Sequence, residues 1–325
     1  MKPAHLLSSP ALSRPARAGL ALTLAGALLA GTSACDLRLG HGAPATLPTA
    51  SAAEATRDAL ARQAALISST AQVVSASGQA EAASQAARLI EDADVQVQAL
   101  GGVWQPWPSP APTPLPTTTP VPTAPSYATP GDLLDSLVAG AQQAHEAALQ
   151  APDAAAAQLY TALTVSWATA ASQLATPLGQ SEATWPTGAA RQVSTVTTTL
   201  DADLLQAYDA ARYAMEEVAA RSADARRSRA QTDAAYADDV VNASIALGGT
   251  DSRLAAYAAP ASDGSTSTDV AWAQQAWVRV CEQEIVSLGA LGLSQRAAAI
   301  DAAIDAGLRA QAWGAPLPAL PGYDA

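Results

Sequence analysis

The chain has 325 residues, which is long enough for one large domain or two small domains with buried cores. Hydrophobic residues make up 49% of it and aromatic residues only 4%, with no Phe, so alanine dominates the apolar content and helices are favoured over strands. The formal charge of −12 argues against a protein that binds nucleic acid or lies on an anionic lipid surface. We therefore expect an all-α protein.

Residues 1–35 have the pattern of an export signal. Lys2, Arg14 and Arg17 form a positive region, and the apolar stretch that follows is too short for a comfortable membrane span. Small residues then precede Cys35, as in a bacterial lipoprotein signal, where the cysteine becomes the lipidated first residue after cleavage. We expect a lipid on Cys35 to anchor the protein to the outer face of the cytoplasmic membrane. Ordinary secretion with a free Cys35 is the alternative.

Processing at Cys35 would leave 14 basic and 29 acidic residues, a formal charge of −15. Once Cys35 is lipidated, the other cysteine, Cys281, has no disulfide partner. Cys281 lies in an apolar stripe without a nearby histidine to activate it, and this favours a packing role over a nucleophilic one.

Residues 36–50 contain glycines and prolines but no apolar period, so we expect a flexible tether. Two helices are predicted next, one beginning at Ser51 and the other ending at Gly101–Gly102, because apolar residues recur at steps of three and four. The proline-rich stretch that follows, residues 103–131, can form neither a helix interior nor a central strand.

Beyond this stretch, Asp132 is predicted to cap a third helix and Asp153 a fourth. The apolar stripe of the third helix includes His145. The proline-rich stretch first suggests a linker between domains. A crossover within one bundle, residues 51–180, is the preferred interpretation, because extended chain at about 3.1 Å per residue easily covers the length of a helix.

Residues 181–325 are predicted to repeat this order. A fifth helix has an apolar stripe from Leu204 to Val218, a sixth ends in glycines, and a second crossover covers residues 248–268. Asp269 is predicted to open a seventh helix, and an eighth follows. A long crossover between the second and third helices of a bundle is the ferritin-like arrangement, so we predict two tandem ferritin-like four-helix bundles.

Three segments of the second half carry a family resemblance: the helix Leu204–Tyr213, the connection Leu254–Pro260 and the tail Trp313–Gly322. Through them the chain resembles a ferritin-like domain of unknown function found in exported proteins of high-GC Gram-positive bacteria. The resemblance implies a ferritin-like fold and no established activity. The family usually carries a Glu-His pair in its first helix, where this chain has Ala211-Arg212, so no ligand is carried over.

A conventional di-iron site is not expected, and neither is a cofactor. Such a site takes a Glu from each of two helices and a Glu-x-x-His from each of the other two. The sequence contains no Glu-x-x-His, and His145 is the only histidine within the predicted bundles. His145 can be a lone metal ligand, a pH-sensitive group or a satisfied core histidine, and the last is favoured. An unconventional cation site could use His145 with Glu282 and Glu284, although such acids usually solvate a helix face.

The one basic cluster, residues 226–229, is expected to pair on the surface with Asp224 and Asp233. Two functions from different classes follow. The first is a non-catalytic interaction or scaffolding module at the membrane, with a protein partner or a second copy and no nucleic acid. The second is a metal-binding or redox ferritin-like protein with unconventional ligands. Binding of a small apolar ligand between alanine-lined helices is a third possibility.

Overall fold

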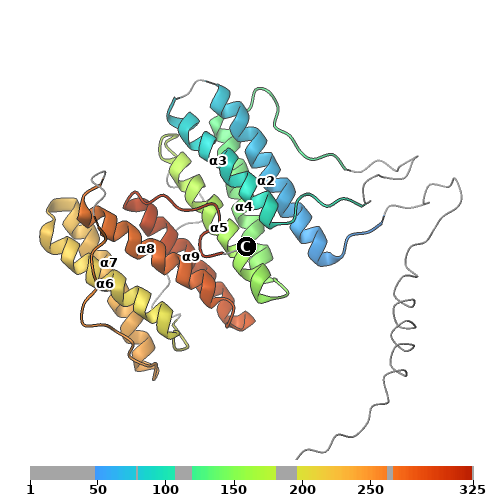
Figure 1. The fold of residues 1–325 in the computed structure, drawn as a ribbon. Coiled ribbons are helices and arrows are strands. Elements are labelled where there is room, and N and C mark those ends of the chain that lie inside the picture. Colours follow the sequence, from blue (N-terminus) through green and yellow to red (C-terminus); the bar gives the residue numbers. More distant parts are fainter. Residues whose placement is uncertain (1–47, 78–79, 107–118, 181–195, 262–265, 324–325) are drawn as a thin grey trace, which may run out of the picture. The chain divides into compact units, whose positions relative to one another are not determined.

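A computed structural model of the chain describes residues 48–77, 80–106, 119–180, 196–261 and 266–323. Within these ranges every regular element is a helix and there is no strand, which confirms the all-α prediction. The predicted signal segment with Cys35 lies outside the described residues. The eight helices (Figure 1) are α2 (Ala52–Ala76), α3 (Ala80–Ala99), α4 (Pro130–Leu149), α5 (Ala154–Ala175), α6 (Ala202–Arg221), α7 (Asp224–Ala246), α8 (Thr268–Ser287) and α9 (Leu293–Ala312).

The first four of these helices pack on one another. α2 contacts α3 and α4, and α5 contacts α4 and α3. The apolar stripe predicted for α2 is buried as expected, with Leu60, Ile67 and Val74 all at most 1% exposed. α5 is buried almost all round from Leu159 to Thr169, because it also contacts α8 and α9.

The last four helices form a second set of contacts. α6 packs against α7 and α8, and α8 packs against α9. α9 also contacts α4 and α5, so all eight helices belong to one compact unit. Gly307 permits a close approach of α9 to α5, since a Cβ atom there would lie 2.8 Å from Cγ1 of Val165. Among the described residues, no helix is long and apolar enough to cross a membrane.

Of the predicted helix starts, one N-cap is confirmed, one N-cap is wrong, and one start is a single residue late. Asp153 caps α5, as predicted, by accepting from the N–H of Ala156. The N-cap of α4 is Thr129, three residues before the predicted Asp132, and Asp132 is the N3 residue of the capping box. α8 begins at Thr268, one residue before the predicted Asp269, and its N-cap is Ser267. In both helices a hydroxyl residue just upstream of the aspartate takes the cap position.

The buried face of α4 agrees only in part with the predicted stripe, which includes Leu134, Ala141 and His145. Leu134 and Ala141 are buried, whereas His145 is only partly buried. The other residues turned to the interior are Leu133, Leu137, Ala144 and Ala148. Neighbouring rows of this alanine-rich helix are similarly apolar, so periodicity alone cannot select between them.

The proline-rich crossover is attached to α2. Asp58 accepts a hydrogen bond from the main-chain N–H of Trp104 at 2.9 Å. One turn later, Arg62 donates to the carbonyl oxygens of Thr119 and Pro120 at 3.2 and 2.9 Å, and its Nε lies 2.8 Å from Asp58. The chain therefore reaches α2 at Trp104 and contacts it again at Thr119, close to the same point.

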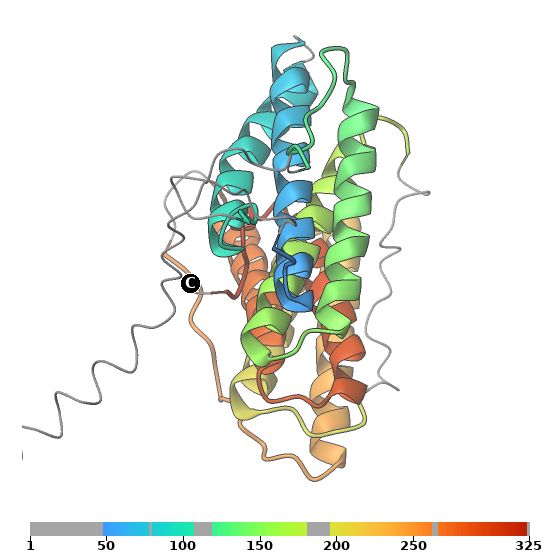
Figure 2. The ribbon, with the colours of Figure 1, turned by 90° about the vertical axis from the view of Figure 1, so that its right-hand side faces the viewer.

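From Thr119 the crossover follows α2 toward the start of α4 (Figure 2). Ser69 accepts from the main-chain N–H of Ala124 at 2.6 Å, two turns beyond Arg62. The helices on either side of the crossover contact each other through α2 and α4 and through α3 and α5.

Candidate functional site

Arg309 occupies the middle of the polar groups buried among α6, α7, α8 and α9. Its Nε donates to Asp305, one turn earlier on α9, at 2.7 Å, and its Nη1 pairs with Asp233 on α7. The side chains of both aspartates are less than 10% exposed. Asp233 also accepts from Nε1 of Trp313 at 2.8 Å. One guanidinium therefore balances two buried carboxylates from different helices.

Aromatic rings surround the same guanidinium. It lies 4.1 Å from the ring centroid of Tyr236 on α7 and 5.1 Å from that of Trp277 on α8. Such cation–π contacts favour the charged arginine in a partly desolvated site. Burial raises the pKa of Asp305, and the charge and hydrogen bond of Arg309 oppose that rise.

The buried polar groups continue from Tyr236 to α6. Tyr208 on α6 packs edge-on against Tyr236 with centroids 6.4 Å apart, and its hydroxyl donates to Glu284 on α8 at 2.6 Å. Tyr208 and Glu284 are both fully buried. Each of the four helices thus contributes to one group, called here the central cluster: Tyr208, Asp233, Tyr236, Trp277, Glu284, Asp305, Arg309 and Trp313.

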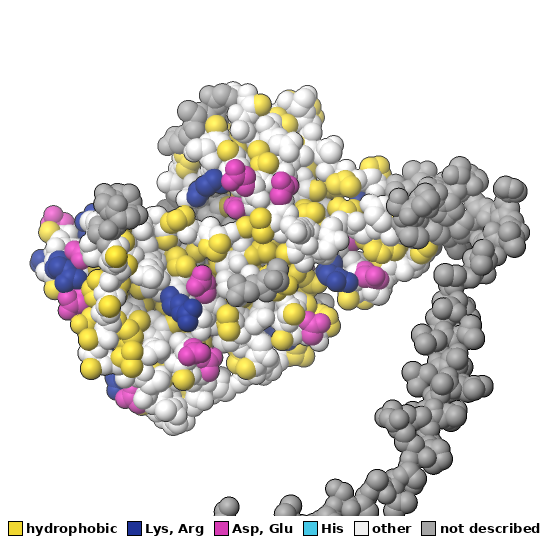
Figure 3. Space-filling model, in the orientation of Figure 1, with side chains coloured by type: hydrophobic (Ala, Val, Ile, Leu, Met, Phe, Trp, Pro, Cys, Tyr) yellow, Lys and Arg dark blue, Asp and Glu magenta, His cyan; other side chains and the backbone are white. Residues whose placement is uncertain are grey.

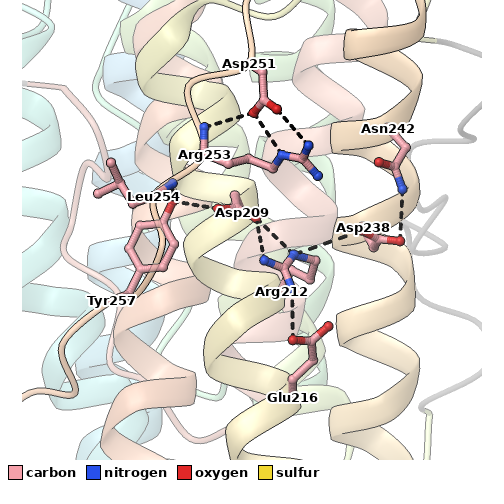
Figure 4. Close-up of polar contacts among 9 residues, drawn as sticks. All are labelled: Asp209, Arg212, Glu216, Asp238, Asn242, Asp251, Arg253, Leu254 and Tyr257. Carbon is pink, nitrogen blue, oxygen red and sulfur yellow. Dashed lines mark hydrogen bonds and ion pairs between the residues drawn. The ribbon is translucent and has the colours of Figure 1, made fainter.

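A second polar network, drawn in Figure 4, lies on α6 and is centred on Asp209. Asp209 is fully buried and accepts from Nε and Nη2 of Arg212 at 2.9 and 2.8 Å. The hydroxyl of Tyr257, from the second crossover, donates to the other oxygen of Asp209 at 2.7 Å. Burial and this contact with Asp209 raise the pKa of Tyr257 to about 12. The network fastens the crossover to α6.

Arg212 extends this α6 network toward solvent by donating to Glu216 at 2.8 Å. Arg212 therefore serves ion pairing, because a guanidinium donates to carboxylates and cannot ligate a cation.

The structure does not bring His145, Glu282 and Glu284 together. His145 on α4 lies near α9, with Nε2 3.7 Å from a carboxylate oxygen of Asp301. Glu284 faces α6, and Glu282 is partly buried on α8. Gly322 of the tail lies close to the main chain of Glu282. In the described parts of the chain, no three or more His, Cys, Asp or Glu residues form a group that could hold a metal ion.

Cys281 is fully buried and burial strongly raises the pKa of its thiol, in keeping with the expected packing role.

The pairing predicted for the basic cluster is wrong for Asp233, which binds Arg309 instead. Arg227 donates to the carbonyl of Ser222 at 2.8 Å, and Arg229 donates to the carbonyl of Ala312. These arginines thus cap the C-terminal ends of α6 and α9, where the helix dipole favours cations.

The sequence predicts Tyr208 in the apolar stripe of the fifth helix, Glu284 as a possible cation ligand and Asp233 as a surface partner of the basic cluster, but it does not predict that they belong to one buried cluster. Asp305 and Arg309 have the i, i+4 spacing of an acid–base pair, but that spacing usually marks an exposed helix surface. Asp233 lies 76 residues before Arg309, and no local pattern joins them.

The surface carries charges of both signs in small neighbouring groups. On the face drawn in Figure 3, basic and acidic side chains lie beside one another among apolar and neutral ones. Surface pairs of this kind contribute little to stability and define no single charged patch on this face.

Comparison with known protein families, with curated proteins and with solved structures finds no match to this chain.

Proposed function

We propose that the chain is an extracytoplasmic lipoprotein, anchored through Cys35, that serves as a non-catalytic helical interaction or scaffolding module. The anchor rests on the sequence around Cys35, and the observation that carries the non-catalytic part of the proposal is the position of Arg309. In a ferritin-like di-iron protein, carboxylates that project inward from the helices hold metal cations. Here a guanidinium supplies the positive charge between the inward carboxylates Asp233 and Asp305.

We also propose the finer fold, two tandem ferritin-like four-helix bundles. The contacts of α2 with α3 and α4, and of α5 with α3 and α4, support a first bundle. The contacts of α6 with α7 and α8, and of α8 with α9, support a second. The crossover that follows α2 to the start of α4 is the long connection that this arrangement requires.

Metal analysis of the purified protein tests the functional proposal. The mature chain would be produced in medium supplied with iron, manganese and zinc, and its metal content measured by mass spectrometry. We expect substoichiometric metal in the wild type. Stoichiometric metal that is lost in Glu284→Gln or His145→Ala would refute the proposal and establish the metal-binding alternative.

The anchor is tested separately with the full-length chain. Wild-type protein should fractionate with membranes and carry the added mass of a lipid on residue 35. Cys35→Ala should abolish both the membrane association and the added lipid mass. A wild-type protein that is released into the medium with a free thiol would instead establish ordinary secretion.

A further inference from the structure

A groove lies between the C-terminal half of α2 and residues 123–130, just before α4. Its volume is about 760 Å³. Val73 and Ala76 line it from α2, and Ala128 and Pro130 line it from the crossover side. Tyr127 stands at the groove with 81% of its surface exposed, the largest exposed fraction of any large apolar side chain in the described residues. The groove is therefore mainly apolar and has an aromatic ring already turned to solvent.

The same surface of α2 already holds an extended, proline-containing chain. Residues 119–124 include Pro120 and Pro122 and lie along α2 next to the groove. Arg62 donates to two of their carbonyl groups, and the hydroxyl oxygen of Ser69 accepts a hydrogen bond from one of their N–H groups. Proline-rich chain keeps its carbonyls free for such donors, because it makes few hydrogen bonds of its own. Ser69 also lines the groove, so the groove continues this intramolecular interface.

The chemistry of the groove restricts what fits. None of its described lining residues is charged, and its polar groups are hydroxyls and the amide of Gln72. A neutral segment with small apolar side chains and free carbonyls matches these groups. A charged segment would lose hydration without gaining an ion pair.

We infer that this groove binds an extended, proline-rich and uncharged segment of a partner protein, with Tyr127 stacking on a proline ring. Aromatic-lined grooves recognise polyproline helices in this way, because the ligand is extended before binding and loses little entropy. The inference rests on the proposed interaction function and names the class of its partner.

The test uses the mature full-length chain and a fluorescent peptide, Pro-Ser-Pro-Ala-Pro-Thr-Pro-Leu-Pro, which has the uncharged sequence of residues 108–116. Fluorescence anisotropy should show saturable binding, and a peptide with alanine in place of every proline should not bind. Tyr127→Ala should weaken binding by roughly tenfold or more, as loss of an exposed aromatic anchor does. Ala76→Arg, which places a long side chain in the groove, should weaken peptide binding to a similar extent.

Two variants serve as controls. Tyr127→Phe keeps the ring and should bind within about twofold of wild type. Val121→Ala removes a side chain that is 42% exposed in the same segment but outside the groove, and should also leave binding unchanged.

Absence of saturable binding, equal binding of the alanine peptide, or an unchanged affinity in Tyr127→Ala and Ala76→Arg would overturn the inference. Concentration-dependent dimers that disappear with Tyr127→Ala would overturn it as well, by assigning the groove to a second copy. Metal content is measured independently, so a failure here is distinguishable from a failure of the proposed function.

Discussion

Replacing Arg309 by methionine tests the central cluster most directly. Methionine retains much of the unbranched apolar stem but removes the guanidinium between Asp233 and Asp305. Both carboxylates are almost fully buried, so water cannot replace the lost charge without opening the cluster. Removing one partner of a buried ion pair costs about 3–5 kcal/mol of unfolding free energy, a large part of the stability of an ordinary domain. We expect Arg309→Met to lose an amount in that range at neutral pH.

The loss should depend on pH with a defined sign. Burial already raises the pKa of Asp305, and the charge and hydrogen bond of Arg309 limit that rise. Without Arg309 the pKa of Asp305 rises further, so the folded state binds a proton more readily than the unfolded state. The folded variant is penalised above that raised pKa, where the carboxylate is ionised, and the penalty disappears as the pH falls below the ordinary aspartate value. The stability gap between variant and wild type should therefore narrow in acid.

Urea unfolding followed by circular dichroism at about pH 7.5 and about pH 5 measures this gap. Arg279→Met on the exposed face of α8 is the matched control and should change stability by less than about 0.5 kcal/mol. Adding Asp233→Asn and Asp305→Asn to Arg309→Met should recover part of the lost unfolding free energy, because burying a neutral amide costs less free energy than burying an unpaired carboxylate. Equal midpoints for Arg309→Met and wild type at neutral pH, or a gap that widens in acid, would refute the reasoning.

Three further experiments test the packing and the α6 network. Tyr257→Phe should cost about 1–2 kcal/mol in urea unfolding, because the buried carboxylate of the α6 network loses a hydrogen bond; an unchanged stability would show that water replaces the hydroxyl. Gly307→Ala should destabilise by about 1–3 kcal/mol despite its better helix propensity, because the new methyl group meets Val165. Gly131→Ala, whose Cβ would have ordinary contacts, should be nearly neutral, and equal effects of the two changes would contradict the close approach. Cys281 should resist a thiol reagent in the native protein and react fully in urea, and rapid native labelling would contradict its burial.

The helices were predictable because their signals are local. Alanine content, apolar steps of three and four, and glycines at positive φ such as Gly101 and Gly102 identify the elements and several of their ends. The same features fail where neighbouring residues compete. Thr129 takes the cap predicted for Asp132, and His145 of the predicted α4 stripe is only partly buried.

The candidate sites depend on contacts between distant parts of the chain. Nothing local to Arg309 shows that its partner is Asp233, and nothing local to Asp58 and Arg62 shows that they hold the crossover. A charged residue in a helix is assigned to the surface by pattern, because burial of a charge is favourable only when a partner arrives from elsewhere.

Propensity and periodicity within a few turns are enough to predict the helical class, the order of the helices and the two long connections. The burial of particular charges and the attachment of the proline-rich stretch to α2 depend on contacts between helices that are far apart in the chain. A buried guanidinium such as that of Arg309 is stabilised only where carboxylates meet it, here Asp305 one turn earlier on α9 and Asp233 on α7, and the contact with Asp233 is made by packing.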